Sequence, residues 1–150
     1  MIAPEEILAR VTKVIVQALG VDEEDVTPSA TLVGDLGAES IDFLDIVFRL
    51  EREFGITVPR GELFVEAAFR DDAGTVRDGR VTEERLAALR SEMPYADLGH
   101  LARDRRLDKL TDLFTVDLLV RYVTWKLENE LRSAHDTRDA VLVAPQPIGR

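Results

Sequence analysis

Cysteine is absent from the 150-residue sequence, and histidine occurs only at His100 and His135. Without cysteine the chain forms no disulfide bond, no thiolate zinc site and no cysteine nucleophile. Two histidines are also too few for a histidine metal cluster. These absences exclude thiolate metal centres, disulfide frameworks and cysteine-based catalysis.

Long apolar runs are missing as well. No stretch reaches the roughly 18 apolar residues that a membrane-spanning helix needs, and the first six residues are acidic where a secretory signal would be basic. The sequence therefore predicts a cytoplasmic protein without membrane insertion.

Basic residues are scarce in the first part of the chain. The whole sequence has 29 acidic and 19 basic residues, a net charge of −10 and a pI of about 4.7. Residues 1–59 hold 12 acidic and 4 basic residues, whereas residues 60–150 hold 17 and 15. This sign excludes a nucleic-acid partner and favours basic protein partners, although drift in composition would also produce an acidic first third.

Apolar residues recur at helical spacing in three segments, which predict helices over 4–19, 40–54 and from 116 to about 131. In the second helix, one stripe is expected to face the core: Phe43, Ile46, Val47, Leu50 and Phe54. A second strip, Ile41, Leu44 and Phe48, is expected to stay exposed as a partner's footprint. The alternative is that this strip is buried against a later part of the chain.

Residues 60 to about 112 differ in sequence pattern from the helical segments on either side and predict only short elements. A small hairpin is expected over 75–82, followed by a helix that Thr82 caps and that ends before Pro94, and by a second short helix over 98–110. Tyr122 and Trp125 are expected to pack against this insert. The prediction is a mainly α-helical single domain over 1–132, with the insert at about 60–112 and a flexible tail over 133–150.

A long loop over 20–39 begins with four consecutive carboxylates at 22–25. We interpret them as a solvated acidic patch, because adjacent side chains on a loop lack the geometry of a metal site. The loop ends in the string Asp35-Leu36-Gly37-Ala38-Glu39-Ser40-Ile41-Asp42. It delivers Ser40 to the first turn of the second helix, where the helix dipole and free N–H groups favour an attached phosphate. A hydrolase that uses Ser40 has little support, because no histidine lies nearby in sequence to activate it as a nucleophile.

This string, with the following amphipathic helix and the F-G-I and V-P segments, resembles the phosphopantetheine attachment segment of acyl carrier proteins. The resemblance covers about half of the chain and includes the acidic first helix and residues 113–119. It implies a helical carrier, not an enzyme, that holds acyl thioesters on a 4'-phosphopantetheine arm attached to Ser40 from coenzyme A. Because the arm carries its own thiol, a chain without cysteine can still carry thioesters.

The resemblance also implies roles for neighbouring residues. Asp35 and Glu39 would contact the phosphopantetheinyl transferase, which supplies Mg²⁺, and Gly37 would form the tight turn. The recognition face for basic patches on acyl-loading ligases or synthases would be Ile41, Leu44, Asp45, Phe48 and Glu51. A monomeric carrier for fatty-acid, lipid or polyketide biosynthesis is expected.

The sequence departs from the family pattern at several positions. Glu39 and Ile41 are mild replacements, but Arg49 and Arg52 place positive charge on the recognition helix and indicate a dedicated partner set. The insert either widens the acyl pocket, adds a recognition surface, or only stabilises the fold. Two alternative functions remain open: a peptidyl carrier for aminoacyl thioesters, and an interaction module that never receives the arm.

Overall fold

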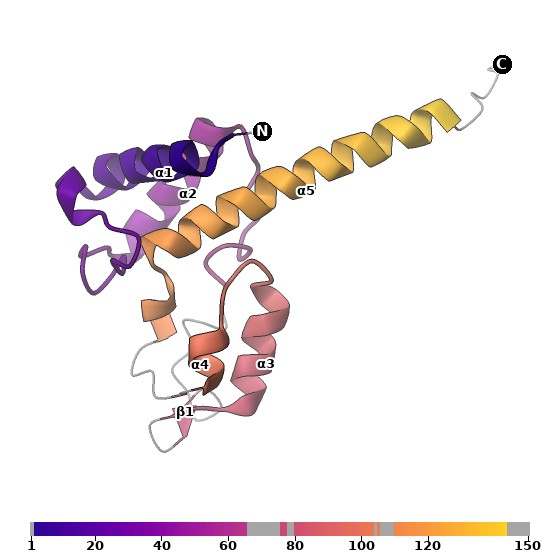
Figure 1. Ribbon diagram of the computed structural model, residues 1–150. Helices are drawn as coiled ribbons and strands as arrows, with labels where there is room; N and C mark the ends of the chain where they lie inside the picture. Colours follow the sequence, from indigo (N-terminus) through magenta and orange to yellow (C-terminus); the bar gives the residue numbers. More distant parts are fainter. Residues whose placement is uncertain (1, 66–75, 78–79, 104, 106–109, 144–150) are drawn as a thin grey trace.

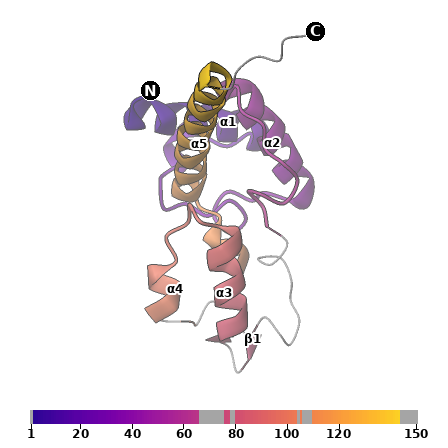
Figure 2. The same cartoon turned by 90° about the vertical axis from the view of Figure 1, so that its right-hand side faces the viewer.

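The computed structural model describes residues 2–65, 76–77, 80–103, 105 and 110–143. Helices α1, α2 and α5 form one part of the molecule, and α3, α4 and a small hairpin lie together beside it (Figure 1). A view turned by 90° shows the same separation (Figure 2). The molecule is mainly α-helical, as the sequence predicted. None of the described helices is long and apolar enough to cross a membrane.

Helix α1 (Pro4–Leu19) has the bounds that the sequence predicted. Proline suits the first turn, where an N–H group would lack a partner, and the two acidic residues there favour the positive end of the helix. Gly20 ends the helix in the left-handed conformation, with φ at 68°. The buried face consists of Ile7, Val11, Val14 and Ile15.

Helix α2 (Ser40–Phe54) also confirms its predicted bounds, and Gly55 ends it at a φ of 65°. Ile46, Leu50 and Phe54 are buried, while Phe43 and Val47 are half-buried. The stripe that was predicted to face the core therefore does so. The carboxylate of Glu53 joins α2 to α1 through Arg10 Nε at 2.8 Å and Lys13 Nζ at 3.0 Å.

Helix α5 (Val116–Val143) packs against α1. The hydroxyl of Thr115 caps it by accepting a hydrogen bond from Leu118 N at 3.1 Å. The helix is longer than the apolar pattern predicted, because it continues to Val143 through the segment expected to be a tail. Its last turns project away from the other helices (Figure 1), and Leu131, the last residue of the predicted stripe, is 60% exposed.

The insert contains β1 (Val76–Arg77) and β2 (Arg80–Val81), which pair antiparallel as the expected hairpin, although its Asp-Gly turn lies outside the described residues. Thr82 caps α3 (Glu83–Glu92) by accepting from Arg85 N at 3.2 Å. Helix α4 (Gly99–Arg103) is shorter than predicted, and the 3₁₀ helix η3 (Leu110–Leu113) precedes α5.

The insert shares its hydrophobic core with the rest of the molecule. Leu86, Leu89 and Met93 from α3 and its end belong to the same cluster of buried side chains as the cores of α1, α2 and α5. Tyr95 packs against Tyr122 and Trp125 of α5, with ring centroids 5.0 Å and 5.4 Å apart. The predicted packing of both α5 aromatics against the insert is confirmed, and α5 is the element that joins the two parts.

Candidate functional site

Ser40 is the first residue of α2, and its side chain is exposed to solvent. The helix start is capped by a neighbour, because the carboxylate of Asp42 accepts a hydrogen bond from Glu39 N at 2.8 Å. Among the described residues, no group forms a hydrogen bond with the Ser40 hydroxyl. The hydroxyl therefore lies at the positive end of a helix dipole and is not used in capping.

The loop before Ser40 is held by its own side chains. The Asp35 carboxylate accepts from Thr31 N, and the Thr31 hydroxyl accepts from Asp35 N, both at 2.9 Å. Gly37 has a φ of 73°, which supports its predicted place in a tight turn. A Cβ at Gly34 would lie 2.9 Å from Thr31 Oγ1, so only glycine fits there without a shift. The sequence pattern does not predict the need for glycine at position 34, because the contact with Thr31 exists only in the folded loop.

This loop is also fixed to the start of α5. Leu32 N donates to Phe114 O at 2.9 Å, Val116 N to Ala30 O at 3.0 Å, and Asp117 N to Pro28 O at 2.8 Å. A buried leucine at 36 and alanine at 38 anchor the last turn of the loop. The position of Ser40 thus depends on backbone contacts with a helix that begins more than 70 residues later.

The exposed strip of α2 is present as predicted. Ile41 is 74% exposed, Leu44 is 58% exposed and Phe48 is 53% exposed. The alternative, in which this strip is buried against the insert, is wrong. Such a group of large apolar side chains on a helix surface is typical of a protein-binding site.

The carboxylates of α2 are mostly engaged inside the molecule. Both oxygens of Asp45 accept from Arg49 Nε at 3.1 Å, and Glu51 accepts from Val58 N at 2.8 Å. The hydrogen bonds of Arg10 and Lys13 lower the pKa of Glu53 below its ordinary value. Of the two acidic members of the expected recognition face, Asp45 has its charge offset by Arg49, whereas Glu51 keeps its negative charge because its partner is a neutral backbone N–H.

An apolar groove of about 610 Å³ lies beside Ser40, between α2 and residues 58–64, which we call the groove wall. This volume is within the range of roughly 300–1,000 Å³ typical of small-molecule sites. The described residues that line it are Ser40, Phe43, Leu44, Val47, Phe48, Glu51, Val58, Pro59, Arg60, Gly61, Leu63 and Phe64. The groove combines one exposed hydroxyl with a predominantly hydrocarbon surface.

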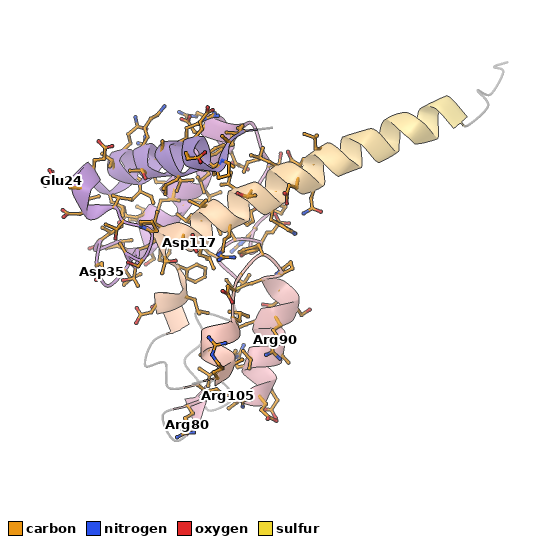
Figure 3. All side chains as sticks on the ribbon, viewed as in Figure 1. Glu24, Asp35, Arg80, Arg90, Arg105 and Asp117 are labelled. Carbon is orange, nitrogen blue, oxygen red and sulfur yellow. The ribbon has the colours of Figure 1, made fainter. Side chains whose placement is uncertain are left out.

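The carboxylates at 22–25 lie in the exposed 3₁₀ helix η1 (Glu23–Asp25) and its N-cap. Within the described part of the chain, no group of three or more histidine, aspartate and glutamate side chains is arranged to hold a metal ion. Figure 3 shows Glu24 and Asp35 on the α1 and α2 side of the molecule, and Arg80, Arg90 and Arg105 on the insert. Arg105 Nη2 lies 3.4 Å from Glu83 of α3, so this base pairs within the insert.

Comparison with known proteins identifies the family. A family model described as a phosphopantetheine attachment site matches residues 9–68. Over 63 residues, the chain is 46% identical to an acyl carrier protein of Thermotoga maritima, and the match covers 42% of this chain and 78% of that relative. The chain belongs to the acyl carrier protein family. Acyl carrier proteins are carriers rather than enzymes, and their covalent prosthetic group is 4'-phosphopantetheine.

The surroundings of Ser40 fit this group. The exposed hydroxyl is accessible to an incoming donor, and the N-terminus of α2 favours a phosphodiester by up to about 1 kcal/mol. The groove beside it offers an apolar surface for the arm and its cargo. The matched part ends at residue 68, so most of the insert and all of α5 lie outside the family match.

Proposed function

We propose that Ser40 is the residue of this acyl carrier protein that receives 4'-phosphopantetheine from a transferase. The observation that carries the proposal is the exposed hydroxyl at the start of α2, at one end of the apolar groove. In the reaction, the hydroxyl oxygen forms a phosphodiester with the phosphopantetheine part of coenzyme A, and the nucleotide part leaves. When bound, the arm supplies the thiol that this cysteine-free chain lacks.

The chain's own residues prepare Ser40 for this step. Asp42 caps the helix, so the Ser40 hydroxyl is not needed for that purpose. Gly37 turns the chain, and the Thr31–Asp35 pair fixes the loop in one conformation. We assign Asp35 mainly to this loop, where its carboxylate already accepts a hydrogen bond. Both carboxylates are exposed, and Glu39 is the better placed of the two to meet a transferase because it directly precedes Ser40.

We propose that the groove receives the acyl group of the loaded protein. Its half-buried side chains Phe43, Val47 and Phe64 present hydrocarbon surface, which favours apolar cargo through burial from water. The carrier would shuttle such acyl thioesters between enzymes of fatty-acid, lipid or polyketide biosynthesis. A short or charged aminoacyl group would gain less from this surface.

We propose further that the partner enzymes dock on Ile41, Leu44 and Phe48, with Asp45 and Glu51 at the edge of the surface. Because Arg49 offsets the charge of Asp45 on this surface, binding would depend more on apolar contact than on charge. This favours enzymes with an apolar docking surface and a modest basic patch. Such a preference fits a carrier with dedicated partners.

The mass of the intact protein tests the attachment site. After incubation with coenzyme A and a broad-specificity phosphopantetheinyl transferase, we expect a mass gain of one phosphopantetheine. Ser40→Ala should remove the gain completely, because the accepting oxygen is gone. Ser29→Ala, which changes another exposed serine of the preceding loop, is the matched control and should keep it. A wild-type protein that gains no mass beside a carrier that does would refute the proposal.

A further inference from the structure

The groove wall, most of which is the first part of the insert, is held by Tyr95 from further along the insert and by α5. The hydroxyl of Tyr95 lies 2.9 Å from the carbonyl oxygen of Glu62 and 3.0 Å from that of Leu63, and donates its proton to these acceptors. The carboxylate of Glu62 accepts from Tyr122 Oη and from Lys126 Nζ, both at 2.6 Å. Tyr95 therefore holds the backbone of the wall at residues 62 and 63, and α5 holds the side chain of Glu62.

These contacts lie in a protected environment. Tyr95 is only 7% exposed, and Tyr122 is fully buried. Burial raises the pKa of both tyrosines, and the nearby Glu62 raises them further, so both hydroxyls keep their protons and remain donors. Their rings meet edge to face at an angle of 80°. A hydrogen bond in such a setting is costly to break, because water cannot readily replace it.

The opposite side of the same wall forms the groove. Leu63 and Phe64 line the groove beside Ser40. The Phe64 ring lies 4.7 Å from the ring of Phe43 in α2 and 5.1 Å from that of Phe114 before α5. A shift of the wall backbone would move these side chains and change the space between α2 and the wall. The position of the groove surface therefore depends on the Tyr95 hydroxyl.

We propose that Tyr95 is a positioning residue through which the insert sets the width of the groove and thereby selects extended apolar acyl chains as cargo. This inference rests on the proposed attachment at Ser40 and the proposed place of the acyl group. Because the wall is fixed before any cargo binds, the binding of a hydrocarbon chain does not have to offset a loss of conformational entropy in the wall. A long chain then lies in the groove, and its thioester is shielded from solvent. A two-carbon group is too short to reach the wall.

The test compares wild type with Tyr95→Phe, which removes the hydroxyl and keeps the ring in the core. Each protein is loaded with acetyl-, octanoyl- or hexadecanoyl-phosphopantetheine from the corresponding acyl-coenzyme A, and thioester cleavage by hydroxylamine is followed by mass. In wild type, cleavage should slow as the chain lengthens. In Tyr95→Phe, the long-chain thioesters should be cleaved about fivefold faster than in wild type, as expected for one lost hydrogen bond, with the acetyl rate unchanged.

A control variant and a second measurement separate this role from general stability. Arg105→Gln removes an ion pair elsewhere in the insert and should leave all three cleavage rates unchanged. Amide hydrogen exchange of the unloaded protein should be faster over 58–65 in Tyr95→Phe alone. This measurement does not require the arm, so it tests the restraint of the wall even if the proposed attachment fails.

The outcomes are distinct. Wild-type protein that cannot be loaded refutes the proposed function and the cargo role together. If the proteins load but Tyr95→Phe shows the wild-type dependence on chain length, the attachment stands and the inference is wrong. Equal acceleration of acetyl and long-chain cleavage also overturns it, because a loosened fold does not discriminate by chain length. Unchanged hydrogen exchange over 58–65 would contradict the restraint itself.

Discussion

Single residues decide how much charge the recognition helix presents. Arg49 lies one turn after Asp45 and binds both of its carboxylate oxygens, while its Nη1 lies 3.4 Å from Gln17 Oε1 of α1. The spacing of four residues would have predicted this pair from the sequence. From the sequence, Arg49 is expected only to add positive charge to the helix, whereas in the structure its side chain also pairs with a carboxylate that partners would otherwise meet.

Replacing Arg49 by alanine should release Asp45 for basic partners. We expect kcat/KM of a transferase with a basic docking patch to rise about twofold to fivefold at low salt, with a steeper fall as salt is added. The matched control is Arg52→Ala, which removes the same charge from an exposed position of the same helix. Equal effects of the two variants would show that the Asp45 pair has no special role.

At the scale of elements, the contact between α1 and α2 depends on Glu53. The Arg10 and Lys13 hydrogen bonds lower its pKa in the folded protein. The stability that its charge contributes is complete above about pH 4.5, the ordinary value, and is lost as the pH falls through the lower folded pKa. An Arg10 guanidinium 4.7 Å from the Phe54 ring centroid adds to the same contact.

Glu53→Gln should therefore destabilise the protein by about 0.5 to 1 kcal/mol at neutral pH, the range for partly exposed ion pairs. The difference from wild type should shrink as the pH falls below about 4.5. Urea unfolding at a series of pH values measures it. Glu128→Gln, an exposed glutamate of α5 without an ion pair among the described residues, is the control. A constant difference across the whole pH range would contradict the account.

The helices that the sequence specifies locally were predicted with their bounds. Gly20 and Gly55 end α1 and α2, and the hydrophobic stripes of both helices have a clear period. The groove wall and its anchors were not predicted. Glu62 meets Tyr95 and Tyr122, which lie 33 and 60 residues further along the chain, and no local pattern encodes such contacts.

At the scale of the whole molecule, the insert and the helical part share one core. We therefore expect them to unfold together in a single transition. Trp125 is the only tryptophan and lies where α5 meets the insert, so its fluorescence reports on this junction. Circular dichroism reports on all helices. The two signals should change at the same urea concentration, and clearly separated midpoints would show an insert that folds independently.

The most direct test of the central claim locates the prosthetic group on the chain. The protein is treated with coenzyme A and transferase, digested with trypsin, and the peptide that contains both Ser29 and Ser40 is fragmented in a mass spectrometer. We predict that the phosphopantetheine is found on Ser40 and nowhere else in the chain. Its presence on Ser29 or on any other residue, with Ser40 unmodified, would contradict the account.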